Sequence, residues 1–566
     1  MFNAITIALM MVLFKGAVYE RGSEGFDCRA YQYATTSYKD TGSMDPAYIV
    51  YAQSDNDVIS AIKLARNHSI AIAIRTGGHQ YCGASSTSGN NIQLDLSKTY
   101  PTVEWEDPED NDYTVVTFGV STSLGLLNSQ LKEHGRFVPT GQCSYVNLGG
   151  HCQTGGYGAS ARSFGLLSDH IQKLRIITAD QDEPKFRWIH RDSESEEEQE
   201  LFYSVVGGSP GNFGVISHVT LQVHRDEDHA LSRGVRGRIP YDRGVLKQLL
   251  DLVLEMGDED DFPADYDVVI TMTSERPAQY ADKPEDAKIV IWAQWANLEG
   301  AGQAYDPTFF QRLIGIASSG GNTSMTPHET VLLQDEPMIM SELTNHWIIP
   351  IVREFQLPYI KNVKLSDLSS SELRANHYTD WVTQRVDMIE ANTQATECYL
   401  VHQFSYGGGR HSRFARNGDD GQTSFSWRDS SFLFVLDVFY NGEKPKVREF
   451  AKQYQKETEL EALGEEGRFS KQDRRLLWGS QDRNLHAARQ YYFDEAPTKY
   501  ERLAANKARF DPRDVFTPNA FSVQAPRKEG AMAAGVKKAV TRLWQAIIDA
   551  PEKRSGDRGG EATTEL

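Results

Sequence analysis

The sequence has few cysteines, no long apolar run and no excess of basic residues. Its five cysteines in 566 residues show no C-x-x-C spacing, which argues against a disulfide scaffold and a cysteine zinc site. The first apolar run, Ala4 to Phe14, has eleven residues, fewer than the roughly 20 that a membrane-spanning helix needs. The net charge of −19 repels polyanions. We therefore predict no metal site, no transmembrane anchor and no nucleic-acid partner.

The N-terminal apolar run leaves the location of the protein open. Its length is typical of the apolar part of a signal peptide, but no Lys or Arg precedes it and no clear small-residue cleavage site follows. The alternative is an N-terminal structural segment. The sequence is therefore compatible with a secreted and with a cytoplasmic protein.

The most informative stretch is rich in glycine. Residues 139–169 contain seven glycines and two cysteines and have no apolar period of 2 or 3.6, so they do not build a core alone. Closely spaced glycines let backbone N–H groups converge on an anion, and an extended diphosphate matches so long a loop. The alternative is a flexible linker, but interleaved Tyr, Val, Leu and Phe are atypical of linkers.

A second stretch, residues 71–97, is predicted to lie beside the first. Alternating Ile70, Ile72 and Ile74 indicate a strand that stops at a Thr-Gly-Gly turn, with His79 at its tip. Another strand is predicted to begin at Ile92. Because no G-x-G-x-x-G stands at a strand-to-helix junction, a Rossmann dinucleotide fold is not favoured.

Together the two stretches resemble the berberine-bridge-enzyme-like oxidases, a branch of the vanillyl-alcohol-oxidase superfamily with a PCMH-type FAD-binding domain. In that family an R-x-G-G-H motif, here Arg75 to His79, attaches flavin through its histidine. A G-x-C-x-x-V-x-x-G-G-H loop, here Gly141 to His151, attaches it again through its cysteine. The resemblance implies FAD held by two covalent bonds, to His79 and Cys143. His151 is a rival for attachment, although a structural or diphosphate-side role matches the family better.

The resemblance also implies a wider set of residues around the cofactor. These are Arg75, Thr76, Gly77, Gly78, Gln80, Val146, Gly149, Gly150, His151, Gly155, Gly156, Tyr157, Gly158, Asn212, Gly214, Val215 and Asn519.

The expected fold class is α+β, with a PCMH-type FAD-binding domain of two subdomains and a substrate domain whose antiparallel sheet is covered by helices. The predicted segments are an N-terminal piece (1–30), the FAD-binding domain (31–228), the substrate-binding domain (229–480), a return to the FAD domain (481–525) and a helical, then disordered tail (526–566). The charge run 193–200 indicates a solvated loop or a first helical turn.

Five tryptophans in the middle of the chain have two interpretations. They are Trp292, Trp295, Trp347, Trp381 and Trp427. Such residues line flat apolar or sugar-stacking clefts in some proteins, and more often they simply belong to a core.

Two residues are predicted to carry the proton chemistry. Tyr492 is the predicted base, because it matches the tyrosine of the family's N-Y-x-D motif, although Tyr491 replaces the asparagine and leaves the register uncertain by one residue. A phenol titrates near 10, so a neighbouring group must tune it or accept its proton. Asp437 interrupts an apolar strand, where a buried carboxylate is costly unless it is partnered. Its alternative is an outward orientation on an edge strand.

The resemblance implies hydride transfer from an alcohol-type carbon to flavin N5 and reoxidation by O₂ to give H₂O₂. Val146 indicates an oxidase, whereas Asn147, which replaces a glycine usual in the family, narrows the oxygen path. The predicted substrate is a sugar or oligosaccharide. The alternative is a polyketide or alkaloid-like scaffold in secondary metabolism. A redox-inactive homologue would lack His79, Cys143 or Tyr492. We expect a monomer.

Overall fold

The computed structural model describes residues 14–32, 44–81, 83–106, 113–257, 262–276, 286–320, 336–348, 359–392, 397–409, 411–418, 421–463, 468–470, 497–519 and 521–526. The chain divides into a body of residues 1–524 and a separate unit of residues 525–566. The expectations for Tyr492 and for the tail lie outside the described residues.

The first subdomain is a four-stranded sheet in the order β1 (Val18–Glu20), β2 (Tyr48–Tyr51), β4 (Ile92–Asp95), β3 (Ile72–Arg75). Strands β2 and β3 both run parallel to β4. Helix α3 (Asp55–His68) connects them and buries Val58, Ile62 and Ala65, which recur at helical spacing on one face. Strand β3 ends at Arg75, and the predicted Thr-Gly-Gly-His turn begins with the next residue.

The second subdomain is a five-stranded antiparallel sheet. Its order is β5 (Val103–Trp105), β6 (Val115–Gly119), β10 (Val215–Gln222), β8 (Ile171–Ile177), β9 (Arg187–His190). Helix α4 (Leu124–Glu133) follows β6 and leads into the glycine-rich stretch. The charge run supplies the start of α7 (Glu196–Val205), and α16 (Pro497–Phe510) returns to contact α7. Shorter elements are α2 (Phe26–Ala30), β7 (Arg136–Phe137), α5 (Leu148–His151), α6 (Ala161–Phe164) and β11 (His224–Arg225).

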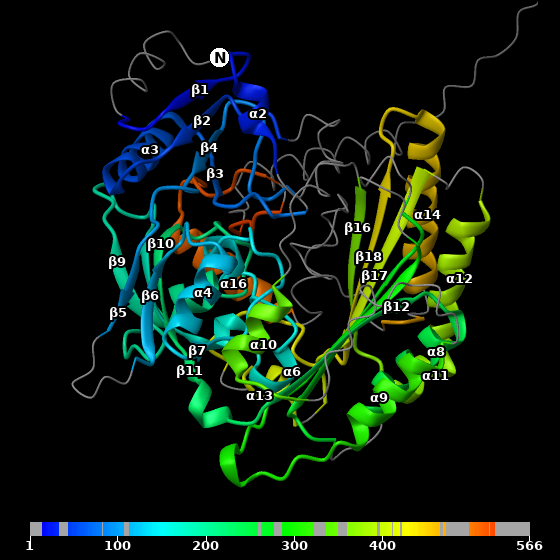
Figure 1. The fold of residues 1–566 in the computed structure, drawn as a ribbon. Coiled ribbons are helices and arrows are strands. Elements are labelled where there is room, and N and C mark those ends of the chain that lie inside the picture. Colours follow the sequence, from blue (N-terminus) through cyan, green and yellow to red (C-terminus); the bar gives the residue numbers. More distant parts are fainter. Residues whose placement is uncertain are drawn as a thin grey trace, which may run out of the picture. The chain divides into compact units, whose positions relative to one another are not determined.

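The third sheet has seven antiparallel strands. Its order is β15 (Glu336–Pro337), β12 (Arg233–Pro240), β14 (Lys288–Trp295), β13 (Tyr266–Thr273), β17 (Cys398–Tyr406), β18 (Phe432–Tyr440), β16 (Tyr359–Ser366). Five helices pack on one of its faces: α8 (Arg243–Glu255), α9 (Thr308–Ser319), α11 (Ser370–Ala375), α12 (Tyr378–Ala391) and α14 (Pro445–Leu463) (Figure 1). Helices α10 (Met340–Trp347) and α13 (Arg413–Arg416) complete the described α-helices, and short 3-10 helices cover Leu167–His170, Asp226–His229 and Gly300–Gly302. The predicted α+β class is confirmed.

The seven-stranded sheet has one helix-covered face and one face turned to the first two sheets. Strand side chains alternate between faces, so on β17 Leu400 and Phe404 enter the core under the helices, while Val401 and Gln403 line a cavity on the other side. Figure 1 shows the first two sheets, in blue and cyan, opposite the seven-stranded sheet, in green and yellow. The predicted domain boundaries stay predictions.

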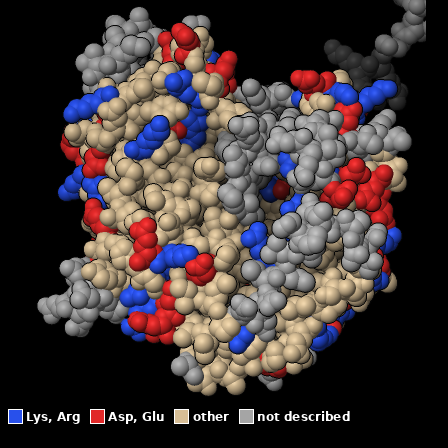
Figure 2. Space-filling model, in the orientation of Figure 1, with Lys and Arg blue, Asp and Glu red and all other residues tan. Residues whose placement is uncertain are grey.

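The outer surface shows no continuous basic patch on the face in view. Acidic and basic side chains are interspersed there, with wide uncharged areas between them (Figure 2). None of the helices in the described part of the chain combines the length and the apolar character that a bilayer span requires.

The helix-covered core contains a buried histidine, His402. It is fully buried, and neither ring nitrogen has a hydrogen-bond partner among the described residues. Its neighbours are the rings of Trp381, Phe404 and Phe434. Burial lowers the pKa of His402 to about 3, because an apolar surrounding disfavours the charged imidazolium.

Replacing His402 is expected to stabilise the protein. Below about pH 6.5 the unfolded chain binds a proton at this position that the folded chain takes up only near pH 3. Wild-type stability therefore falls as pH decreases between these values, by up to about 1.4 kcal/mol per pH unit. His402→Leu removes both this slope and an unpaired polar group, and should raise the free energy of unfolding by about 1–2 kcal/mol at pH 7. Thermal unfolding at pH 7 and pH 5 measures both effects.

The control for this substitution is His68→Leu on the exposed end of α3, which should change stability by less than about 0.5 kcal/mol. A His402→Leu protein that is less stable than the wild type at both pH values would show that the imidazole makes a favourable interaction in the core.

Candidate functional site

A cavity of about 350 Å³ lies between the glycine-rich stretch and the open face of the seven-stranded sheet. That size suits a small-molecule site. Most of the residues predicted around the cofactor line it. They are Thr76, Gly77, Gly78, His79, Gln80, Cys143, Val146, Gly149, Gly150, His151, Gly156, Tyr157, Gly158 and Gly214, together with Asp437. Two stretches far apart in sequence thus meet the seven-stranded sheet at one place.

Five predicted residues are not among those lining the cavity: Arg75, Gly155, Asn212, Val215 and Asn519. The Arg75 guanidinium is buried and pairs with Asp95, with 2.5 Å between Nε and Oδ2. It also donates to the carbonyl of Arg29 at 2.7 Å. Its charge is used to join β3 to β4, so here it supports the turn that precedes His79.

The two asparagines in this group hold the C-terminal return of the chain. Asn212 accepts from the backbone N–H of Val523 at 2.6 Å. Asn519 donates to the carbonyls of Ala84 and Ser86 at 3.0 and 2.8 Å. Both therefore fasten the last described segment to the first two subdomains.

The two histidines of the site are half-buried and neutral. His79 Nδ1 lies 3.0 Å from the carbonyl oxygen of Gly77, which fixes the ring as a donor at that nitrogen. His151 Nε2 accepts from the backbone N–H of Gly141 at 3.0 Å. Burial lowers the pKa of each to about 4. His151 therefore braces the start of the glycine-rich stretch.

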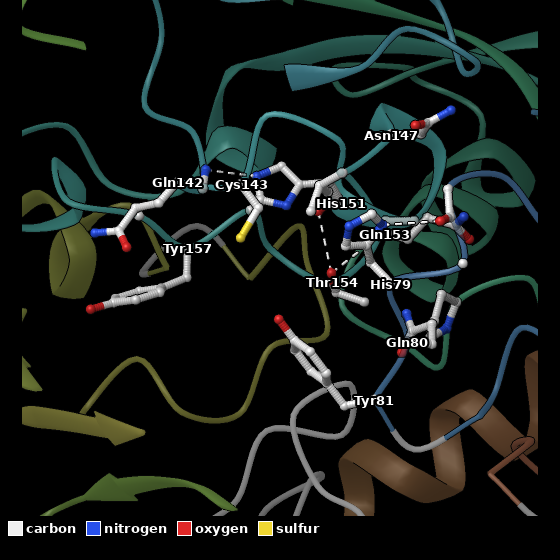
Figure 3. A pocket seen from close by; sticks show the side chains of 18 of the residues that line it. His79, Gln80, Tyr81, Gln142, Cys143, Asn147, His151, Gln153, Thr154 and Tyr157 are labelled. Atoms are coloured by element: carbon white, nitrogen blue, oxygen red, sulfur yellow. Dashed lines mark hydrogen bonds between the residues drawn. The ribbon is translucent and has the colours of Figure 1, made fainter. Parts of the chain in front are cut away.

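Cys143 lies on the same wall of the cavity as the two histidines (Figure 3). Burial raises the pKa of its thiol to about 11, and the nearby Lys361 ammonium opposes that rise. At neutral pH the thiol is therefore largely protonated. Since the thiolate is the nucleophile, bond formation at Cys143 requires loss of that proton.

The opposite wall carries a buried ion pair, Lys361 on β16 and Asp437 on β18. Lys361 Nζ lies 2.7 Å from Asp437 Oδ2, and the two residues are paired across the strands. Asp437 is 6% exposed, and its strand lies inside the sheet, between β17 and β16. The carboxylate therefore faces the cavity, and the edge-strand alternative does not apply.

Burial and charge act in opposite directions on Asp437. Its pKa is raised by burial, and the Lys361 ammonium offsets part of that rise. Oδ1, the second carboxylate oxygen, is buried and has no hydrogen-bond partner among the described residues. One oxygen is thus committed to Lys361, and the other has capacity for a ligand.

Sequence reasoning missed the polar residues on the sheet side. Gln403 Nε2 donates to Gln142 Oε1 at 3.0 Å and to Thr271 Oγ1 at 3.2 Å, which ties the residue before Cys143 to β13 and β17. Tyr157 shares a hydrogen bond with Ser405. Lys361 was missed as well. Its only signal was a lysine at an alternating position of the strand sequence YIKNVKLS.

Of the five tryptophans, Trp292 lines the cavity. Its ring stacks on Trp347, with 5.0 Å between centroids. Trp295, Trp347, Trp381 and Trp427 are buried and are not among the lining residues. The cleft interpretation therefore fits one residue and the core interpretation the other four.

The glycines of the cavity fit a large flat ligand with a diphosphate. A Cβ on Gly150 would meet nothing closer than Gln80 Nε2 at 4.0 Å, so its small size leaves open space. Gly156 has φ +73°, and a Cβ there would lie 2.5 Å from Leu167 Cβ. These positions bring backbone close to the cavity, as an FAD cradle requires.

The match to known proteins fits this geometry. Residues 46–182 match the model of the FAD binding domain. This chain contains an FAD binding domain. It is 32% identical over 180 residues to the uncharacterized FAD-linked oxidoreductase YvdP of Bacillus subtilis (strain 168), which covers 32% of this chain and 38% of that protein. Berberine bridge enzyme-like 12 of Arabidopsis thaliana is 33% identical over 204 residues, 35% of this chain and 36% of that protein.

Solved structures of the same fold cover nearly the whole chain. A chitooligosaccharide oxidase has a TM-score of 0.67 and 17% identity, covering 92% of this chain and 99% of its own. The glucooligosaccharide oxidase from Acremonium strictum, described with a 6-S-cysteinyl, 8α-N1-histidyl FAD, has a TM-score of 0.67 and 18% identity, over 92% and 99%. The expected resemblance to the berberine-bridge-enzyme-like oxidases is confirmed. The two curated relatives are matched over little more than a third of their length.

Proposed function

We propose that this protein is an FAD-dependent oxidoreductase that holds its cofactor through His79 and Cys143 and oxidises an alcohol-type carbon. One observation carries the proposal: both attachment candidates and the buried carboxylate of Asp437 line a single glycine-walled cavity. When bound, FAD supplies a two-electron acceptor. The residues of the chain bind it, exclude water and move the proton.

Covalent attachment is supported by the protonation state of His79 and by the location of Cys143. A neutral imidazole keeps a nitrogen lone pair, and burial holds His79 neutral. Cys143 is the only cysteine among those lining the described cavity, whereas Cys152 is buried with its thiol near the carbonyl of Gly149. Two bonds would fix the flavin ring without using non-covalent contacts on the substrate side.

Asp437 is proposed to serve the proton transfer that accompanies hydride loss. A base must reach the hydroxyl proton while the carbon loses hydride, and Oδ1 is the carboxylate oxygen with remaining acceptor capacity. Tyr492 stays the predicted partner of Asp437 and lies outside the described residues. The pair was predicted from sequence as a tyrosine tuned by a carboxylate.

The sheet side of the cavity favours an apolar scaffold over a sugar. Its aliphatic lining residues are Val290, Val363, Val401, Leu433 and Val435, and its polar ones are Thr271, Gln403, Lys361 and Asp437. A sugar needs partners for most of its hydroxyls, because buried unpaired polar groups are costly. The oligosaccharide oxidases of the same fold support the sugar candidate. The aliphatic wall supports a polyketide or alkaloid-like scaffold, which we place first.

Oxygen is the proposed electron acceptor. Val146 and Asn147 both line the cavity. Asn147 donates from Nδ2 to the carbonyl of Ser121 at 2.9 Å, which holds its side chain in a fixed direction. The Asn147 side chain is therefore held in one position beside the proposed flavin site, where it would narrow the path of oxygen.

Peroxide detection on two substrate panels tests the substrate class. Purified holoenzyme is offered oligosaccharides in one panel, and phenolic and polycyclic alcohols in the other. We expect turnover with peroxide formation in the second panel. Turnover of oligosaccharides alone would reject the apolar scaffold, and turnover of neither panel with O₂ but of either with an artificial electron acceptor would make the protein a dehydrogenase.

A further inference from the structure

The ion pair between Lys361 and Asp437 has a geometry that sequence motifs did not indicate. Both residues are buried, at 5% and 6% exposure, and the pair is directional: Nζ donates to Oδ2 at 2.7 Å. Lys361 Nζ also lies 4.4 Å from the centre of the Tyr81 ring. An ammonium held by a carboxylate and an aromatic face has little freedom to leave its place.

The two oxygens of Asp437 are therefore not equivalent. Oδ2 is occupied by the lysine, while Oδ1 has no partner among the described residues although it is buried. A buried carboxylate oxygen without a donor is costly, and it lies in the wall of a cavity built for a ligand. A donor supplied by the substrate would satisfy it.

We propose that Lys361 is a positioning residue that keeps Asp437 ionised and aims its second oxygen, Oδ1, at the hydroxyl proton of the substrate. This inference rests on the proposed function and adds the residue that makes the base competent. Without the ammonium, burial alone would favour the neutral carboxylic acid, which has no capacity to take a proton.

The ion pair would serve the oxidation of an alcohol to a carbonyl compound. The O–H bond of the alcohol breaks and its proton passes to Asp437 Oδ1. The C–H bond on the same carbon breaks and its hydrogen leaves with both electrons; FAD, if held by His79 and Cys143, would supply the two-electron acceptor. The carbon–oxygen single bond becomes double. The alcohol is oxidised by two electrons. Asp437 ends as a carboxylic acid whose Oδ2 still accepts the hydrogen bond from Lys361.

Among the titratable groups that face Asp437, Lys361 alone supplies a counter-charge. In the described part of the chain these groups are Lys361 beside it on β16, Tyr359 two residues before Lys361 on the same strand, Cys143 from the opposite wall and Tyr81 beyond the lysine. Burial raises the pKa of Tyr359 and of Cys143, so both are neutral near pH 7. Lys361 is the one cation in this set.

The test compares Lys361→Met, which removes the charge at similar length, with Lys361→Arg, which keeps a charge. Infrared titration of the carboxyl group, with an Asp437→Asn protein subtracted, gives the pH at which Asp437 becomes protonated. We expect this midpoint to rise by at least one pH unit in Lys361→Met, since a neighbouring cation lowers a carboxyl pKa by about 1–3 units. In Lys361→Arg the midpoint should lie closer to the wild-type value, because a positive charge remains beside Asp437.

A binding measurement separates this role from a merely structural ion pair. The probe is 2-phenylpropan-2-ol, an apolar alcohol whose hydroxyl carbon carries no hydrogen and so is not oxidised, and the reference is its methyl ether, which has no hydroxyl proton. Calorimetry on wild-type holoenzyme should show at least tenfold tighter binding of the alcohol above the carboxyl midpoint. In Lys361→Met this preference should appear only above the raised midpoint, and in Asp437→Asn it should fall below threefold.

Two results would overturn the inference: equal binding of alcohol and ether by the wild type, or a preference in Lys361→Met that persists where its carboxyl is protonated. The flavin of each preparation is assayed separately by acid precipitation. A yellow precipitate with no alcohol preference rejects the role of Lys361 alone. Colour lost to the supernatant rejects covalent attachment and leaves the binding result to decide the inference by itself.

Discussion

Combining His79→Ala with Cys143→Ala will release all of the flavin from the protein when it is precipitated with acid. Either covalent bond alone retains the cofactor, so each single variant should keep a yellow precipitate, and only the double variant should lose its colour to the supernatant. Absorbance of the two fractions measures the effect. Mass mapping of peptides from the single variants should find flavin on Cys143 when His79 is replaced, and on His79 when Cys143 is replaced.

Matched variants in the same loop control for indirect damage. Cys152→Ala removes a buried thiol nearby and should leave both attachments in place. His151→Ala removes the acceptor for the Gly141 N–H and should not release flavin, because the His151 Nε2 is already engaged in that hydrogen bond. A colourless precipitate from wild-type protein, or flavin mapped to His151 or Cys152, would contradict the proposed attachment sites.

Asp437→Asn is expected to lower turnover by about 10²–10⁴-fold, the usual contribution of a positioned base. The amide keeps the shape of the side chain and has no charge with which to take a proton. Flavin content and the visible spectrum should stay as in the wild type, because Asp437 lies on the sheet wall and the attachment candidates on the opposite one. Steady-state turnover with the substrate found in the peroxide assay gives the result.

The control is a buried carboxylate away from the cavity. Asp226 accepts from the backbone N–H and the hydroxyl of Ser341 at 2.8 and 2.6 Å, so Asp226→Asn tests loss of charge without loss of a cavity residue. It should change turnover by less than about threefold, even where it lowers stability. Equal losses in both variants would mean that Asp437 acts only through folding.

Local pattern predicted many of the elements because their signals are contained in short windows. The strand predicted to begin at Ile92 does begin there, as β4, and the strand indicated by Ile72 and Ile74 is β3, since an alternating period needs no knowledge of the rest of the chain. The charge run was open between loop and helix. It became the first turn of α7 because Leu201, Phe202 and Val205, which follow it, are buried.

Arg75 shows where motif reasoning reaches its limit. The motif implied that the arginine belongs to the cofactor site, but a motif fixes spacing and not direction. Successive strand residues point to opposite faces, so the arginine at the end of β3 meets Asp95 on β4, while Thr76 to Gln80 in the following turn line the cavity.

The sequence by itself determined the two attachment candidates, the glycine-rich loop and the α+β class, because each is encoded by neighbouring residues. Only the tertiary structure decided that Asp437 has a partner. Lys361 and Asp437 lie 76 positions apart, and they meet because β16 and β18 pair in one register. That register depends on which face of each strand is buried, a property of the assembled sheet that neither strand carries alone.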